Sequence, residues 1–379
     1  MRRAEAVDVV IVGAGAAGLA AAGALKARGC VAVALEQDEQ IGGTWARRYA
    51  RLHLHTVRRF SGLPHFDIPR DYPQYIPKDL FARYLQMYAE ALELDIRLGE
   101  RVERIARGDG GWRVDTAQCS WEARAIVIAT GRYRKPVLPS WPGRESFQGR
   151  LLHSAEYGSG VDFAGTRVLV VGIGNSGAEI AADLAEQGAA HVAIAVRTSP
   201  PIMPRDLFGL IPAQFLGLLF TPIPAPRLLD WAGAIVRRLG TGDLSRHGLG
   251  REAWGPFTAR RPAVIDVGFL RQLRAGRIHV RPSVERLTTT GVVYAGGQEE
   301  PLDAIVAATG YRTALDDILD VPDAIRSDGR PSHRSGRATP HPGLYFMGYD
   351  ETTRGLLFEV NRDSRRLAQS ISGYLRAKA

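Results

Sequence analysis

The sequence VVIVGAGAAGLAAA, residues 9–22, decides the fold of this 379-residue chain. Its four leading apolar residues predict a buried strand, and the alanine-rich run after the last glycine predicts a helix. The first glycine permits a tight turn, the second lets the backbone approach a pyrophosphate closely, and the third lets the helix pack on the strand. Because the free N–H groups of a helix N-terminus attract phosphates, we expect this fingerprint to bind a dinucleotide. The candidate contacts are Gly13, Gly15, Ala16, Ala17 and Gly18.

Residues 31–35 predict a second strand that ends at Glu36. A carboxylate about 20 residues after such a fingerprint accepts hydrogen bonds from a ribose 2′-OH, so we expect Glu36, with Gln37 beside it, to hold a ribose. The motif Gly-Gly-Thr-Trp follows at 42–45. Its glycines would allow close approach to a ligand and its tryptophan could cover a flat ring, although the motif also fits a simple turn with a packed tryptophan. The candidates taken from it are Gly43, Thr44 and Trp45.

A second fingerprint, VLVVGIGNSG at 168–177, again joins a predicted strand to a predicted helix. The strand that follows, 191–196, ends in Arg197 and Thr198 and carries no acid. An arginine at this place suits a 2′-phosphate and leaves a 2′-OH without an acceptor, so the second nucleotide should be NADP(H). An ordinary exposed arginine is the alternative. The candidate contacts in the fingerprint are Gly172, Gly174, Asn175, Ser176 and Gly177.

Two fingerprints predict two dinucleotides in one chain. The first site, with its strand-end acid and its Gly-Gly-Thr-Trp motif, suits FAD, and the second suits NADPH, because a hydride can pass from nicotinamide to flavin. The two cysteines, Cys30 and Cys119, form no CxxC motif, so a dithiol is excluded as the next electron acceptor, and no metal site is predicted. The electrons therefore go to O2, or to a quinone, a carrier protein or another small molecule.

A strand followed by Ala-Thr-Gly occurs twice, at 125–131 and at 302–310. The last helix is predicted to begin near residue 356, and its N-terminus could face the pyrimidine end of a flavin. These segments and their neighbours complete the expected cofactor contacts. They are His55, Thr56, Val102, Thr130, Gly131, Thr309, Gly310, Tyr311 and Leu356.

We therefore expect an α/β fold with two Rossmann-type three-layer dinucleotide-binding domains. The FAD-binding domain takes residues 1–157 and 281–379, and the NADPH-binding domain, residues 158–280, is inserted into it. The active site should lie in the cleft between them. A helical insert at about 203–260 contains an apolar stretch, 207–240. We expect this stretch to cover the active site or to pack on its own domain, with a helix at a membrane surface as the alternative.

The net charge of +9 is carried almost wholly by arginine. The positive field of these arginines could steer polyphosphate cofactors to their sites. Alternatively, the arginine content could reflect codon usage alone. Nucleic-acid binding would need a clustered basic face or a known module, and the sequence shows neither. No apolar run reaches the roughly 18 residues of a transmembrane helix, and the fingerprint inside the first apolar run argues against a signal peptide. We expect a cytoplasmic protein without nucleic-acid or membrane partners.

Over nearly its whole length the chain resembles the flavin-containing monooxygenases. Between its two fingerprints that family carries the signature FxGxxxHxxxY/F, which Phe147, Gly149, His153 and Tyr157 match. Residues 201–281, with Met-Pro-Arg-Asp at 203–206 and Asp-Val-Gly at 266–268, are more similar to the plant YUCCA-type branch of indole-3-pyruvate monooxygenases and its bacterial relatives. A basic residue usually follows the signature aromatic residue. Here that residue is Gly158, so we expect one contact to a phosphate to be looser. A Baeyer–Villiger enzyme would carry Trp-Pro or Trp-Asp after its histidine motif, which Tyr157-Gly158 does not match.

The resemblance implies that NADPH reduces FAD, that O2 then forms a C4a-(hydro)peroxyflavin, and that one oxygen atom enters a small organic substrate. Sulfide or amine oxygenation and the oxidative decarboxylation of an α-keto acid all fit. Many family members carry an asparagine near the flavin where this chain has His55, so His55 is the expected catalytic residue, with a structural role as the alternative. A flavin oxidase or reductase that passes electrons to a quinone or to oxygen is the second hypothesis. A non-catalytic nucleotide-sensing or membrane-associated protein that uses the 207–240 stretch as its contact is the third, and a homodimer is considered.

Overall fold

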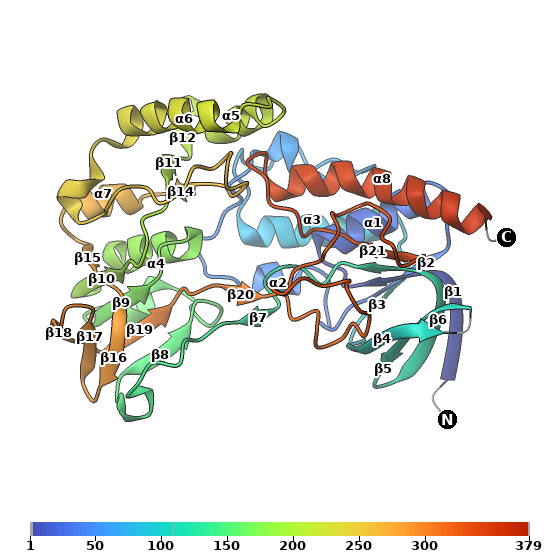
Figure 1. The fold of residues 1–379 in the computed structure, drawn as a ribbon, viewed down its shortest axis with the longest axis horizontal. Coiled ribbons are helices and arrows are strands. Elements are labelled where there is room, and N and C mark those ends of the chain that lie inside the picture. The colour runs from blue at the N-terminus through green and yellow to red at the C-terminus, as the bar shows by residue number, and fades with distance from the viewer. Residues whose placement is uncertain (1–2, 109, 378–379) are drawn as a thin grey trace.

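Each glycine fingerprint belongs to its own sheet, and the two sheets form the two halves of the molecule in Figure 1. The computed structural model describes residues 3–108 and 110–377. The first sheet has the strand order β3-β2-β1-β6-β5-β4, and β21 also pairs with β6. Its strands are β1 (Arg3–Val12), β2 (Ala32–Leu35), β3 (Ile96–Arg97), β4 (Val102–Gly108), β5 (Gly111–Thr116), β6 (Cys119–Ile128) and β21 (Leu344–Phe346).

The first sheet is the middle layer of a three-layer domain. β1 runs parallel to both of its neighbours, β2 and β6. Because side chains alternate along a strand, Val9 and Ile11 pack under helices, whereas Val10 and Val12 face the opposite side. On that opposite side they share a core cluster with side chains of β4 and β5, at one end of the same sheet, and of residues 315–325. The helices are α1 (Ala16–Lys26), α3 (Lys78–Ala91) and α8 (Leu356–Ala377).

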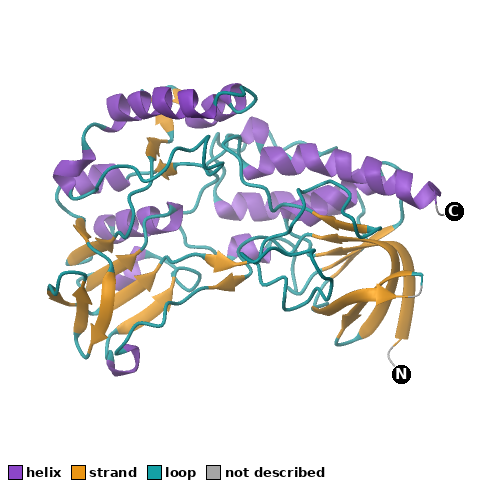
Figure 2. Cartoon of the chain, in the orientation of Figure 1, coloured by secondary structure: helices purple, strands orange, loops and turns teal. Residues whose placement is uncertain are grey.

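The second sheet repeats this plan with the strand order β15-β10-β9-β19-β8, all parallel. Val168 and Val170 of β9 pack against helices, and Leu169 faces a small antiparallel sheet, β16-β17-β18. In both halves of Figure 2 the long helices lie above the main sheet. The elements are β8 (Arg150–His153), β9 (Arg167–Val171), β10 (His191–Ala195), β15 (His279–Arg281), β16 (Val284–Thr288), β17 (Gly291–Tyr294), β18 (Glu299–Pro301), β19 (Ala304–Ala307), α4 (Asn175–Glu186) and α7 (Phe269–Arg274).

The predicted fold class is confirmed, and the second domain is an insertion because its strands fall between β6 and β21. β8, which precedes residue 158, and β19, which follows residue 280, both pair within the second sheet, so that sheet includes strands from outside the expected 158–280 range. β16–β18 form a small sheet of their own. The four buried apolar residues of β19 pair with β9 on one side and with β8 on the other.

Two short strands carry the chain between the domains. β6 and β19 each end before an Ala-Thr-Gly sequence, and the segments that follow pair with each other as β7 (Lys135–Pro136) and β20 (Tyr311–Arg312). In Figure 1 this pair lies between the two halves. The repeated Ala-Thr-Gly sequence thus marks the two equivalent points at which the chain leaves the two sheets.

The helical insert predicted near 203–260 contains α5 (Ala213–Phe220) and α6 (Pro226–Thr241), which run along one edge of the molecule in Figure 1. β11 (Ile202–Pro204) pairs with β14 (Val264–Asp266) and joins the two ends of the insert. Within the insert, β12 (Asp206–Leu207) pairs with β13 (Ile211–Pro212) as a short hairpin. Within the described residues, no helix combines the length and apolar character needed to cross a membrane.

Candidate functional site

The first fingerprint has the geometry that a bound pyrophosphate requires. Gly13 has a φ of +100°, and a Cβ added there would lie 2.8 Å from the carbonyl oxygen of Ala129. A Cβ on Gly18 would overlap the carbonyl oxygen of Gly13, so only glycine lets α1 pack this closely on β1. A Cβ on Gly15 would meet nothing within 4 Å. The second glycine therefore faces open space at the N-terminus of α1, as a phosphate-binding turn should.

Glu36 stands at the end of β2, beside this turn. Its carboxylate accepts hydrogen bonds from the backbone N–H of Ala14 at 2.7 Å and from that of Asp38 at 3.0 Å. Burial raises the pKa of Glu36, and these backbone donors oppose the shift. The two bonds fix the carboxylate next to the turn, where it can accept ribose hydroxyl groups through its remaining lone pairs. Its neighbour Gln37 is exposed.

Segments far apart in the sequence meet at the same end of the first domain. A Cβ on Gly348 would lie 2.6 Å from the Cβ of Ala17, which places the loop after β21 against the start of α1. Gly355, with a φ of +100°, lies against the Thr56 side chain, directly before Leu356 begins α8. The structure thus brings the α1 turn, Thr56 and the α8 N-terminus together. Thr130, which precedes Gly131 after β6, is joined to the same loop by a 2.8 Å hydrogen bond between its hydroxyl and that of Tyr349.

Two other expected contacts take part in packing. Gly43 and Thr44 begin a short helix, α2 (Gly43–Ala46), and Trp45 in it packs edge-to-face on Phe81 with the ring centroids 4.8 Å apart. Val102, the first residue of β4, is buried in the same core cluster as residues 10, 12 and 35. The contact with Phe81 agrees with the alternative interpretation of the motif, a turn with a packed tryptophan.

The second fingerprint repeats the first. Gly172 has a φ of +102°, a Cβ on Gly177 would overlap the carbonyl oxygen of Gly172, and a Cβ on Gly174 would meet nothing within 4 Å. The side-chain oxygen of Asn175 accepts a hydrogen bond of 2.9 Å from the backbone N–H of Ile265, which ties the start of α4 to β14. An open phosphate-binding turn therefore faces the N-terminus of α4 as well.

Arg197 and Thr198 follow β10 and are both exposed. Within the described part of the chain, Arg197 forms no ion pair. Its guanidinium is therefore available to a phosphate at the strand end, where the 2′-phosphate of NADPH is expected.

His55 and Thr56 face different domains. While Thr56 contacts the residue before α8, the Nε2 atom of His55 lies 2.6 Å from Oε1 of Glu179, on the second turn of α4. Glu179 is only 2% exposed, and its charge acts on the buried Tyr49 hydroxyl. Burial and the negative charge of Glu179 raise the pKa of Tyr49, so this hydroxyl keeps its proton. The imidazole of His55 is thus held by α4 of the second domain, while its backbone belongs to the first domain.

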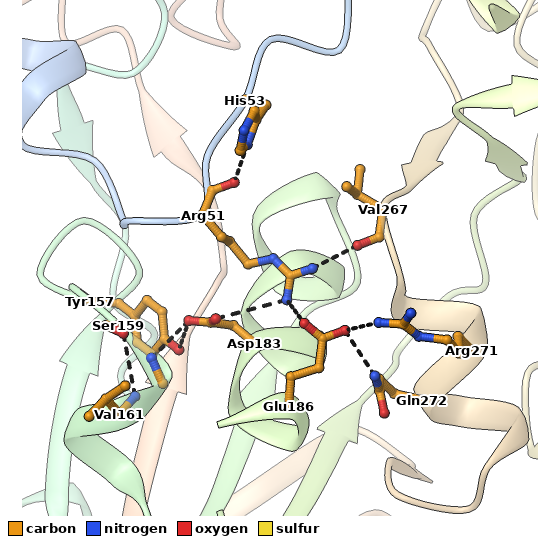
Figure 3. A network of polar contacts seen from close by, with 11 residues as sticks. Arg51, His53, Tyr157, Ser159, Val161, Asp183, Glu186, Val267, Arg271 and Gln272 are labelled. Atoms are coloured by element: carbon orange, nitrogen blue, oxygen red, sulfur yellow. Dashed lines mark hydrogen bonds and ion pairs between the residues drawn. The ribbon is translucent and has the colours of Figure 1, made fainter. Parts of the chain in front are cut away.

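Farther along α4, an arginine from the first domain reaches into a pair of acids, as Figure 3 shows. Arg51 Nη1 donates to Glu186 at 3.0 Å and lies 3.9 Å from Asp183, and its Nη2 donates to the carbonyl oxygen of Val267 at 2.8 Å. Asp183 also accepts a 2.7 Å hydrogen bond from the buried Tyr157 hydroxyl. Tyr157, the last residue of the family signature, therefore orients an acid that faces the other domain.

The acid at position 186 is held by three donors. Burial would raise the pKa of Glu186, but hydrogen bonds from Arg271 and Gln272 and the charge of Arg51 outweigh it and lower the pKa. This carboxylate therefore stays ionised and keeps the contact between the domains at neutral pH.

The signature histidine fastens a linker between the domains. His153 is buried; its Nδ1 accepts a hydrogen bond from the Ala155 N–H, so the ring is the tautomer whose Nε2 donates to the carbonyl oxygen of Gly310 at 3.0 Å. Burial lowers the pKa of His153, which keeps the ring neutral. Tyr311 packs edge-on against the same ring, and Thr309 donates to the carbonyl oxygen of Val137.

A cleft of about 560 Å³ opens between the two domains. Arg51, His53 and Tyr75 line it from the first domain, and Asp183 and Arg205 from the second. It runs along the later turns of α4, and neither His55 nor the fingerprint glycines are among the residues that line it. A cleft between the domains is therefore present, and whether it belongs to the predicted active site stays a prediction.

The acids on α4 escaped the sequence analysis. Glu179, Asp183 and Glu186 recur at the spacing of one helical face, which in an isolated sequence is typical of a solvated surface. The first two are instead 2% and 4% exposed. One signal in the sequence could have pointed to them: three acids lie on a helix whose N-terminus the fingerprint places next to a ligand.

Comparisons with known proteins agree with this arrangement. The family model described as flavin-binding monooxygenase-like matches residues 6–321. The chain is 39% identical to the rice (Oryza sativa subsp. japonica) indole-3-pyruvate monooxygenase YUCCA1, over 96% of this chain and 90% of that protein. It is 35% identical to the Arabidopsis thaliana indole-3-pyruvate monooxygenase YUCCA6, over 96% of this chain and 89% of that protein.

Solved structures show the same fold. A doubly substituted variant of a flavin monooxygenase from Stenotrophomonas maltophilia superposes with a TM-score of 0.78 at 27% identity, covering 98% of this chain and 99% of that one. A cyclohexanone monooxygenase superposes with a TM-score of 0.79 at 20% identity, covering 99% and 88%, which bears on the fold alone.

The open turns at Gly15 and Gly174 fit two dinucleotides, and the cysteines, both free, offer no dithiol between them. The family model covers more than half of the chain, and the relatives align along nearly all of it. The chain therefore belongs to the flavin-binding monooxygenase-like family, and it is an oxidoreductase, a monooxygenase with FAD and NADPH as cofactors.

Proposed function

We propose that this enzyme oxidatively decarboxylates an α-keto acid with an aromatic side chain. The observation that carries the proposal is the 39% identity, over 96% of the chain, to a protein named indole-3-pyruvate monooxygenase. In the proposed reaction the keto acid, O2, NADPH and a proton give the carboxylic acid one carbon shorter, CO2, NADP⁺ and water. One oxygen atom of O2 enters the new carboxylate and the other leaves as water.

The site residues divide the work by domain. The turn at Gly13–Gly18 and the Glu36 carboxylate would hold the FAD pyrophosphate and ribose, with Thr56 and the α8 N-terminus toward the ring system. The turn at Gly172–Gly177 would hold the NADPH pyrophosphate, and Arg197 would bind its 2′-phosphate. When both are bound, reduced FAD supplies the activation of O2.

His55 is our candidate for the side chain at the reaction site. Its neighbour Thr56 contacts the residue before α8, and its own Nε2 meets a buried acid on α4, which would put it where the two proposed cofactor sites approach each other. Glu179 would act as a positioning residue, because its 2.6 Å contact fixes the direction of the imidazole ring. The protein's contribution is then orientation and exclusion of water.

The Arg51 contacts in Figure 3 would keep the two sites at a fixed separation. Arg51 belongs to the same segment as His55, and it is bound to α4 and to Val267 of the second domain. A change that loosened this arginine would therefore displace His55 as well. Hydride transfer and oxygenation both depend on such placement, because a misplacement of about 1 Å can cost about a hundredfold in rate.

The test is a product survey with the purified flavoprotein, NADPH and air. Indole-3-pyruvate, phenylpyruvate, an alkyl aryl sulfide and a tertiary amine are supplied separately, and product, CO2 and H2O2 are measured against NADPH consumed. We expect an arylacetic acid and CO2 in proportion to NADPH from the keto acids. A sulfoxide or amine oxide as the only oxygenated product would contradict the keto-acid proposal. NADPH consumption that yields H2O2 alone with every substrate would favour the oxidase hypothesis.

A further inference from the structure

The exposed apolar side chains of this protein are concentrated in one place. Fourteen large hydrophobic residues of the described chain are exposed, and ten of them lie between Phe208 and Leu239. We call these ten the apolar surface. The six most exposed, each 61–83% exposed, are Phe208, Leu210, Leu219, Leu228, Trp231 and Leu239. Monomeric proteins rarely leave more than a few hundred Å² of contiguous apolar area in water, so a cluster of this kind marks an interaction site.

Helix α6 turns its apolar side outward. Leu228, Trp231, Ile235 and Leu239 follow one another at intervals of three or four residues and therefore share one face of the helix. All four are exposed, by 44–74%. The 207–240 stretch was expected to cover the active site or to pack on its own domain; α6 does pack there through its polar side, and this apolar face stays exposed.

The polar side of α6 is the side that packs on the protein. The Asp230 carboxylate accepts hydrogen bonds of 2.8 Å from the backbone N–H groups of Phe257 and Thr258. Arg237 is 1% exposed and binds Glu252 through two hydrogen bonds, at 3.0 and 2.6 Å. These bonds fix the rotation of the helix about its axis. The fold therefore fixes the apolar face of α6 outward, because turning that face inward would break all of these hydrogen bonds.

The charges around the apolar surface are positive. Residues 201–262 contain eight arginines and four acids, a net charge of +4. All four acids are engaged: Asp206 with Tyr75, Asp243 with Ser245, and the other two as described for α6. Arg227 and Arg238, near the two ends of α6, are both exposed. The partner that complements such a surface is apolar inside and anionic at its boundary.

A second copy of the chain fits these charges less well. In a two-fold symmetric dimer each contact occurs twice, so an antiparallel pairing of α6 with its copy would bring Arg227 of one subunit toward Arg238 of the other. Of the acids in residues 201–262, Asp230 and Glu252 are bound by neighbouring groups, and the charge of Asp243 acts on Arg238, so Arg227 has no acid of its own among them. An anionic lipid surface offers negative headgroups at both ends of the helix and hydrocarbon between them.

We propose that the apolar surface, which includes the exposed faces of α5 and α6, binds this enzyme to the interface of an anionic lipid bilayer. The two helices run in line along one edge of the molecule, so they can lie in the plane of the interface together (Figure 1). Trp231 and the leucines of α6 enter the boundary between headgroups and acyl chains, and Arg227 and Arg238 bind the headgroups. Such a contact is peripheral and needs no helix that spans the membrane.

The experiment is sedimentation of the FAD-loaded full chain with sucrose-filled vesicles. One set is phosphatidylcholine alone, and the other contains about three parts phosphatidylglycerol to seven of phosphatidylcholine, a charge density on which basic segments bind strongly. We expect the wild type to sediment with the anionic vesicles and at least about tenfold less with the neutral ones. The triple variant L228S/W231S/L239S should lose at least about tenfold in binding to the anionic vesicles. The matched control Val161→Ser removes an exposed valine, 61% exposed, on the second domain and should bind as the wild type.

Flavin content and the rate of flavin reduction by NADPH verify that each variant is folded. If the triple variant does not fold, R227Q/R238Q, which alters only exposed side chains, should weaken binding to anionic vesicles and leave the neutral ones unaffected. Absence of wild-type binding to either vesicle would overturn the proposal, as would equal binding by the wild type and the folded variants. Light scattering that shows a dimer in the wild type and a monomer in the triple variant would assign the surface to a second copy instead.

Discussion

Replacing Gly174 by alanine should weaken NADPH binding and leave the fold and the flavin intact. Gly174 has a φ of −82°, which alanine adopts freely, and an added Cβ would meet no protein atom within 4 Å. The new methyl group therefore intrudes only on the space in front of α4, where a pyrophosphate comes close. Gly177→Ala adds the same methyl group three residues later, where it would overlap the carbonyl oxygen of Gly172. This second variant is the matched control for stability.

The expected magnitudes follow from these two environments. Displacing the pyrophosphate from the α4 N-terminus forfeits at least one charge-assisted hydrogen bond, worth about 1.5–3 kcal/mol. Because about 1.4 kcal/mol is a factor of ten in affinity, Gly174→Ala should raise the KM for NADPH roughly tenfold to a hundredfold. Gly177→Ala forces the helix away from β9, and overpacking of this kind costs about 1–3 kcal/mol of stability.

The assay is stopped-flow reduction of the bound flavin at increasing NADPH concentration, together with flavin content and thermal unfolding of both variants. Gly174→Ala should melt as the wild type and keep its flavin, while Gly177→Ala should melt several degrees lower. An unchanged KM for NADPH in Gly174→Ala would refute the assignment of the second fingerprint. Equal melting temperatures for the two variants would refute the packing argument.

Three further predictions address other residues. Arg197→Gln should lower kcat/KM for NADPH about tenfold or more and leave that for NADH nearly unchanged, because it removes one charge-assisted contact to the 2′-phosphate; steady-state kinetics with both nucleotides measures this. Glu179→Ala should release more H2O2 per NADPH and lower product turnover on the order of tenfold to a hundredfold, whereas Glu179→Gln, which keeps a hydrogen bond to His55, should recover most of the coupling; equal coupling in both variants would remove the positioning role. Burial, with Glu359 nearby, raises the pKa of Asp363 from 3.8 to about 6. The folded chain therefore retains a proton that the unfolded chain has lost in this window, so stability falls as the pH rises through it. Asp363→Asn should raise the unfolding free energy by up to about 3 kcal/mol above about pH 6 and by little near about pH 4, and a denaturant titration at both pH values that finds the same difference would contradict this.

The fold could be predicted because its determinants are local. A glycine whose Cβ would overlap a carbonyl oxygen, as at Gly18 and Gly177, cannot be replaced without moving a helix off its strand. The same short glycine pattern is therefore needed wherever a helix packs this closely on its strand, and the sequence contains it twice. The acid at Glu36 and the arginine at Arg197 follow from the same register, since each stands at the end of the next strand.

What could not be predicted depends on contacts between distant segments. The Ala304–Ala307 strand resembles Ala125–Ile128, and only its pairing with β8 and β9 assigns it to the second domain. Glu179 looks like a surface acid until the His55 segment is placed against it. The periodicity of α6 indicates that one face is apolar but not which way it points, because that depends on partners such as Glu252.

The central claim is that this protein transfers one atom of O2 to an organic acid. The measurement that tests it most directly is mass spectrometry of the product formed under ¹⁸O2 from an aromatic α-keto acid, with NADPH as the reductant. The account predicts an arylacetic acid that carries one ¹⁸O atom in its carboxylate, formed in proportion to NADPH consumed. An unlabelled acid, or no acid with NADPH fully converted to NADP⁺ and H2O2, would contradict it.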